Sequence, residues 1–116
     1  MHYMILAYRP DGPNPEHPEE LEKLETAFRL YECNLRDGGH LVASAQFGQA
    51  SECTRFVWAT GGTHRASSHP ADRLFGMFLI DVKDRDEADQ LASRCPGSPG
   101  VTVELRKASA PPAEIR

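Results

Sequence analysis

The 116-residue sequence lacks the features that identify most membrane, secreted and nucleic-acid-binding proteins. No apolar run approaches the roughly 20 residues that cross a bilayer, and the opening segment is too short and unflanked for a signal peptide. The three cysteines include no C-x-x-C pair, so they suggest neither a disulfide framework nor a zinc site. The net charge of -4 comes from interspersed acidic and basic residues, without a cationic stripe for phosphates. We therefore expect a cytoplasmic protein with free, buried thiols and neither a membrane nor a nucleic-acid partner.

The length is that of one ordinary domain. A chain of about 13 kDa buries roughly two-thirds of its extended surface on folding, which is enough for a core without a metal or a disulfide. We place one domain at residues 1–107 and a frayed tail at 108–116, where Pro111 and Pro112 interrupt regular structure. No cofactor is expected.

The first half of the chain predicts a strand, a helix and a second strand. Residues 2–9 are aromatic, aliphatic or β-branched and run into a proline-rich loop. Pro18 suits the first position of a helix, and residues 37–39, Asp-Gly-Gly, suit its end. A second strand follows at 40–47. Apolar residues recur between the helix ends at steps of three and four, as in an amphipathic helix: Leu21, Leu24, Phe28, Tyr31 and Leu35.

The second half repeats this order after an inserted hairpin. Residues 53–60 are β-rich and reach Gly61-Gly62, as in a hairpin arm, and an irregular polar loop is expected after them. Residues 75–82 are apolar nearly throughout, as in a strand in the middle of a sheet. Asp84 and Glu87 have capping-box spacing and predict a helix start. Residues 101–105 alternate as a last strand.

This order predicts an α+β ferredoxin-like sandwich, βαβ-hairpin-βαβ, with two helices on one face of an antiparallel sheet. The other face of the sheet then needs a cover. A second copy supplies one most simply, because a two-fold dimer buries the same patch on both subunits. We expect a homodimer.

Several segments of the chain match one protein family. They are residues 1–8, Pro18-Glu19-Glu20, residues 39–43, residues 78–82 with Asp86-Glu87-Ala88, residues 94–97 and residues 101–106. Through them the chain resembles the YCII-related proteins from residue 1 to about residue 107, and it looks most like the branch named for an Asp-Gly-Pro-Phe (DGPF) motif. This resemblance implies a ferredoxin-like fold of the dimeric α/β barrel type.

The chain departs from that family at two places. Counting back without gaps from residues 79–82, the Asp-Gly-Pro-Phe motif falls on residues 64–67, His-Arg-Ala-Ser, where nothing matches. Better understood members are similar in carrying a helix histidine, paired with an aspartate, for acid-base or eliminating chemistry on small organic acids. Phe28 stands at the corresponding place. Because phenylalanine cannot transfer a proton, that mechanism is not implied here.

The loop that lost the motif is dense in polar side chains. A histidine positioned by a carboxylate is the commonest general acid or base, so either His64 or His69 moves a proton and Asp72 orients it. Arg65 or Arg73 then holds a substrate carboxylate. The competing interpretation is a solvated polar loop that happens to contain histidines. The full set is His64, Arg65, Ser67, Ser68, His69, Asp72 and Arg73.

The serines of this loop are assigned to substrate binding. Ser67 or Ser68 as a nucleophile is disfavoured, since neither has a G-x-S-x-G elbow. Imidazole suits several metals, but the spacing of His64 and His69 is not a recognised ligand pattern, so no metal is expected.

Three further positions near strand ends or on the arm complete the candidates. Tyr8 and His40 are strand-end residues that we add to the substrate-binding set, although a core or rim position is the plainer interpretation of each. Phe56 and Trp58 are two apart and share a face of the arm, which suits a dimer seam or the lid of an apolar pocket.

Two functions remain open from the sequence. The first is a small-molecule enzyme of metabolic or natural-product type, a lyase or isomerase, in which a loop histidine transfers a proton during elimination, isomerisation or cyclisation. The second is a non-catalytic dimeric ligand-binding or accessory protein on the same fold, since the fold itself hosts unrelated functions.

Overall fold

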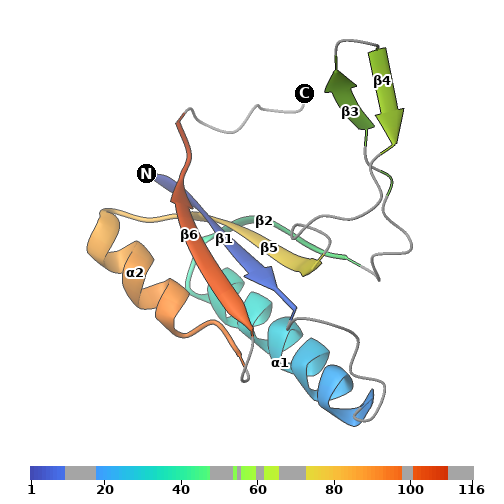
Figure 1. Cartoon of the computed structure of the whole chain (residues 1–116). Coiled ribbons are helices and arrows are strands. Elements are labelled where there is room, and N and C mark those ends of the chain that lie inside the picture. The colour runs from blue at the N-terminus through green and yellow to red at the C-terminus, as the bar shows by residue number, and fades with distance from the viewer. Residues whose placement is uncertain are drawn as a thin grey trace.

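The computed structural model describes residues 1–9, 18–47, 54, 56–59, 62–65, 73–97 and 101–109. Six strands and two helices follow one another in this part of the chain (Figure 1). In order they are β1 (His2–Tyr8), α1 (Pro18–Asp37), β2 (Leu41–Gln46), β3 (Phe56–Ala59), β4 (Gly62–Arg65), β5 (Leu74–Asp81), α2 (Arg85–Ser93) and β6 (Thr102–Lys107).

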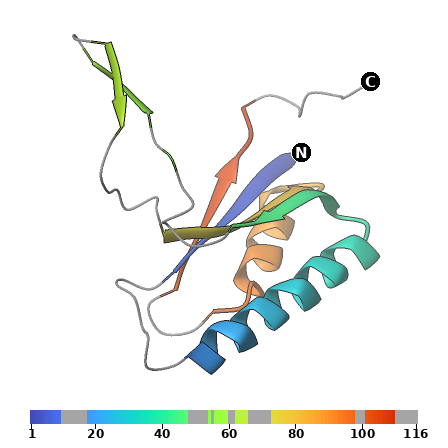
Figure 2. The same ribbon diagram turned by 90° about the vertical axis from the view of Figure 1, so that its right-hand side faces the viewer.

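Four of the strands form one antiparallel sheet in the order β2-β5-β1-β6. Both helices cover the same face of this sheet, and β3 and β4 pair separately as a hairpin that projects away from the helices (Figure 2). The two βαβ halves therefore interleave as in a ferredoxin-like fold, which confirms the predicted α+β class. The strand predicted for the middle of the sheet, β5, lies between β2 and β1.

The helix ends follow the predicted capping chemistry. At the start of α2, the Asp84 carboxylate accepts from the amide of Glu87 at 2.9 Å, and the Glu87 carboxylate accepts from the amide of Lys83 at 3.3 Å. At the end of α1, Gly39 adopts a φ of 78°, the left-handed conformation that glycine tolerates best. The amide of His40 then donates to the carbonyl of Leu35 at 2.9 Å, which completes a Schellman cap and directs the chain into β2.

An aromatic core joins the sheet to the helices. The Phe28 ring stacks on Phe78, with ring centres 5.8 Å apart, and meets the edge of Phe75 at 4.7 Å. The Tyr31 hydroxyl of α1 donates to the carbonyl of Leu91 in α2 at 2.6 Å and so ties the helices together. The buried core cluster is Tyr3, Ile5, Ala7, Phe28, Tyr31, Leu35, Phe75, Phe78, Ile80, Val82 and Ala88.

Two local expectations were wrong. We expected an irregular loop from residue 63, but β4 runs through Arg65 because the arm needs a second strand to satisfy the backbone of β3. The thiol of Cys33 is exposed rather than buried, since Phe28, Tyr31 and Leu35 turn the opposite side of α1 to the core. Cys95 is half-buried, and burial raises the pKa of its thiol to about 12.

The arm exposes its aromatic side chains. Phe56 keeps 55% and Trp58 keeps 79% of its surface accessible. Both project from β3, as their spacing of two residues requires.

Within the described residues, no helix is long and apolar enough to cross a membrane.

Candidate functional site

The residues predicted for catalysis fall mostly outside the part of the chain that is described. Ser67, Ser68, His69 and Asp72 lie there, so their assignments stay predictions. His64 and Arg65 are placed by backbone alone, opposite Val57 and Phe56 in the arm.

Arg73 is the residue with which the predicted loop re-enters the sheet. It directly precedes β5, and its carbonyl accepts from the amide of Arg9 at 2.6 Å. The loop therefore returns beside the end of β1. That end of the sheet also carries Tyr8.

Tyr8 and His40 lie at opposite ends of the sheet. Tyr8 ends β1 and pairs with Thr102 of β6. His40 precedes β2, next to the end of β5 where Asp81 pairs with His2. The six residue steps of β1 separate these ends by about 20 Å. Each of the two residues belongs to its own group of polar side chains.

At the His40 end, a carboxylate orients an imidazole. The Nδ1 atom of His40 lies 3.6 Å from Oε1 of Glu87 and 3.3 Å from the carbonyl oxygen of Asp81. Both contacts favour the tautomer with a proton on Nδ1, which leaves Nε2 as the acceptor. The ring also lies against Gly38, where a Cβ would come within 3.2 Å of Cδ2 of His40. We call His2, His40, Asp81 and Glu87 the histidine cluster.

Asp81 of this cluster makes two further contacts with groups that are or can become positively charged. Its carboxylate accepts from the N-terminal ammonium of Met1 at 3.1 Å and lies 4.0 Å from Nε2 of His2. The hydrogen bond from the ammonium, followed by the charge of the ammonium, holds the pKa of Asp81 below its ordinary value. The carboxylates of the cluster are thus already engaged by cations and imidazoles.

The sheet face away from the helices is apolar in its middle. The register places Leu6 opposite Met77 and Met4 opposite Leu79 on this side. Ala43 and Ala45 of β2 lie beside Leu79 and Met77. We call these six residues the open face. In the described part of the chain no helix covers it (Figure 2).

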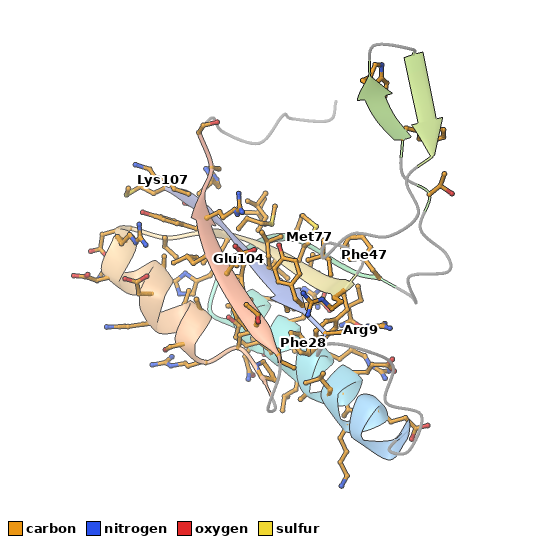
Figure 3. The ribbon with its side chains drawn as sticks, in the orientation of Figure 1. Arg9, Phe28, Phe47, Met77, Glu104 and Lys107 are labelled. Atoms are coloured by element: carbon orange, nitrogen blue, oxygen red, sulfur yellow. The ribbon has the colours of Figure 1, made fainter. Side chains whose placement is uncertain are left out.

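A polar strip borders the open face at the Tyr8 end. Interaction with the Glu104 carboxylate, chiefly hydrogen bonding, raises the pKa of Tyr8, and the same interaction lowers the pKa of Glu104. Nη2 of Arg106 lies 3.5 Å from Oε2 of Glu104. Met77 and Glu104 extend from the two strands that flank β1 (Figure 3). These polar groups therefore lie at one edge of the apolar open face.

Sequence reasoning missed Glu104 as the partner of Tyr8 and Glu87 as the partner of His40. Glu104 alternates with Val103 and Leu105, which pack against the core, so its orientation towards the other face could be read from the sequence. Its interaction with Tyr8 depends on the β1–β6 register. Glu87 was recognised as a capping residue. That it also reaches His40 depends on where α2 lies against the sheet.

The comparison with known protein families covers nearly the whole chain. The YCII-related domain matches residues 1–106 of the chain. No curated protein matches it in sequence. The resemblance noted from the sequence is confirmed at the level of this domain, while the match does not establish the DGPF branch.

Proposed function

Because the chain belongs to the YCII-related domain family, we propose that it is a small-molecule enzyme in which a histidine of the segment between β3 and β5 transfers a proton. The reaction is an elimination, isomerisation or cyclisation, as a lyase or isomerase performs. His64 or His69 carries the proton, and Asp72 orients the imidazole. The ligand lies at the Tyr8 end of the sheet.

The observation that carries this proposal is the convergence at that end. The hydrogen bond from Arg9 to Arg73 brings the end of the loop beside Tyr8. The Tyr8–Glu104 pair there offers a hydroxyl and a carboxylate next to the apolar open face. A substrate held at the edge of this face beside Tyr8 lies next to Arg73, the point where the chain from His69 and Asp72 returns to the sheet. Water is displaced from the open face by its apolar residues, which strengthens hydrogen bonds to the substrate.

We further propose that the protein is a homodimer in which a second copy covers the open face. Its apolar side chains come from three adjacent strands and have no helix over them in the described part of the chain. Met77→Asp and Leu79→Asp place a charge in the middle of this seam and should shift the mass measured by light scattering from two chains to one. Ser93→Asp on α2 is the matched control. A wild-type protein with the mass of one chain contradicts this part of the proposal.

Deuterium exchange tests the proton transfer without a known substrate. The protein is incubated in D2O with a panel of small keto acids, hydroxy acids and lactones, and proton NMR follows the loss of carbon-bound hydrogen. We expect exchange in at least one compound and a loss of about 100-fold or more in His64→Gln or His69→Gln, the contribution of one acid-base group. His40→Gln should leave the exchange rate unchanged, since His40 lies at the far end of the sheet. A loss in His40→Gln alone moves the chemistry to the histidine cluster and contradicts the assignment to the loop.

A second function, a non-catalytic ligand-binding or accessory protein, is favoured by one specific observation. Phe28, which by the resemblance stands where the better understood members carry a helix histidine, is 1% exposed and contacts the rings of Phe75 and Phe78. That position therefore holds a buried core residue, which cannot transfer a proton. Binding of panel compounds without any exchange supports this second function and overturns the first.

A further inference from the structure

The positive charge of Arg9 lacks a negative partner in the described part of the chain. Arg9 follows β1, and its Nε–H is buried without a hydrogen-bond acceptor there. Its Nη2 donates to the carbonyl of Phe47 at 3.2 Å, and Cζ lies 5.9 Å from the centre of the Phe75 ring. Both partners are neutral. No described carboxylate forms an ion pair with Arg9.

Backbone hydrogen bonds hold together the strand ends that this side chain spans. The amide of Arg9 donates to the carbonyl of Arg73 at 2.6 Å, and the amide of Phe47 donates to the carbonyl of Phe75 at 2.8 Å. The side chain thus extends from the end of β1 towards the end of β2 and crosses β5 between them. Figure 3 labels Arg9 and Phe47 at this end of the sheet. A guanidinium held in this way is a preorganised fork, because its donors are planar and their direction is set.

A buried donor in a native protein nearly always has an acceptor. For a guanidinium, the best acceptor is a planar group with two oxygens, since two parallel hydrogen bonds then form at once. Phe47, whose carbonyl accepts from the guanidinium, keeps 41% of its surface exposed and so offers an apolar surface near the fork to whatever carries those oxygens. A strongly hydrated inorganic anion gains nothing from such a surface, whereas the ring or chain of an organic acid does.

We propose that Arg9 binds the carboxylate of a small organic acid, with the apolar body of the ligand against Phe47. The proposal names a ligand class for the proposed enzyme. Only the role of this ligand as the substrate rests on the proposed function. Tyr8 is the preceding residue in the chain, and Arg73 is the point where the loop with His69 and Asp72 returns. The sequence analysis assigned carboxylate binding to Arg65 or Arg73. The structure adds Arg9, whose Nε–H has no acceptor among the described residues and can donate to a carboxylate.

Benzoate is the probe for this site and benzamide is its neutral control. NMR of protein labelled with nitrogen-15 reports the Nε–H signal of Arg9 directly. We expect benzoate to shift this signal with saturation and benzamide to leave it in place. Arg9→Lys keeps the charge but loses the fork, and should weaken benzoate binding about tenfold or more, the ratio for one charge-assisted hydrogen bond. Arg85→Lys, an exposed arginine paired with Asp89 on α2, should bind as the wild type does.

Three results overturn the proposal. One is an Nε–H signal that benzoate and benzamide shift equally or not at all. Another is equal benzoate affinity in Arg9→Lys and in the wild type, with folded spectra for both. The third is a shift of the Arg9 signal in Asp72→Asn without ligand, joined to a lack of benzoate binding by the wild type, which identifies Asp72 as an internal counter-ion. If deuterium exchange is still observed alongside any of these results, proton transfer by His64 or His69 is unaffected. Carboxylate binding by Arg9 and proton transfer by the histidine can therefore fail separately.

Discussion

We expect replacement of Phe28 by histidine, the residue type that the resemblance to better understood members implies for this place in the helix, to destabilise the protein. The side chain is 1% exposed and makes two ring contacts, to Phe75 at 4.7 Å and to Phe78 at 5.8 Å. Each aromatic pair contributes about 0.5–1.5 kcal/mol beyond burial. A buried imidazole group without a partner costs about 1–3 kcal/mol. Phe28→His should therefore lower the free energy of unfolding by about 3 kcal/mol.

The loss should also depend on pH. Burial disfavours the charged form of an imidazole, so the pKa of the new histidine falls in the folded state below its unfolded value of about 6.5. The unfolded chain then binds more protons in acid, and stability falls as the pH falls below that value. We expect a larger loss at pH 5 than at pH 8 when unfolding by urea is followed by circular dichroism.

Leu30→His is the matched control on the same helix. Leu30 is 62% exposed, so the substitution should change the free energy of unfolding by no more than about 0.5 kcal/mol. At neutral pH, the loss of about 3 kcal/mol in Phe28→His corresponds to a fall in Tm of about 12 °C for a domain of this length. Equal stability of the two variants would refute the reasoning, because Phe28 would then face a solvated cleft and not the core.

Three further predictions follow from single contacts. Tyr31→Phe removes the hydrogen bond between the helices and should cost about 1 kcal/mol in thermal unfolding; an unchanged Tm contradicts it. Glu104→Gln should lower the pKa of Tyr8 towards its ordinary value in an ultraviolet titration, since the carboxylate holds it raised. In the wild type this pair therefore stabilises the fold up to about pH 10 and loses that contribution as the pH rises further; a Tyr8 pKa that does not move argues against the bond. Peptide-resolved alkylation at pH 8 should modify Cys33 much faster than Cys95, whose pKa burial raises to about 12; equal rates contradict the burial.

The fold was predictable from the sequence because its signals are local. Pro18 and the Asp37-Gly38-Gly39 run mark the ends of α1, and the Asp84–Glu87 spacing marks the start of α2. These signals need only residues three or four apart to be read. The hairpin was predicted, but the position of its second strand was missed because Gly62–Arg65 is too polar and short to show alternation.

The candidate site was less predictable because it depends on strand order and register. Tyr8 and His40 look equivalent in sequence, as single polar residues at strand ends. Only the order β2-β5-β1-β6 sends them to opposite ends of the sheet. Arg9 gave no signal at all, since the burial of its Nε is set by packing at the end of β1.

The position of a bound ligand tests the central claim most directly. Backbone amide shifts of nitrogen-15-labelled protein, recorded during a benzoate titration, map where the ligand lies. We predict that the largest shifts fall at Tyr8, Arg9, Arg73 and Glu104, and that His40 and Glu87 stay unchanged. Shifts confined to the histidine cluster would contradict the account, because the ligand would then bind at the other end of the sheet.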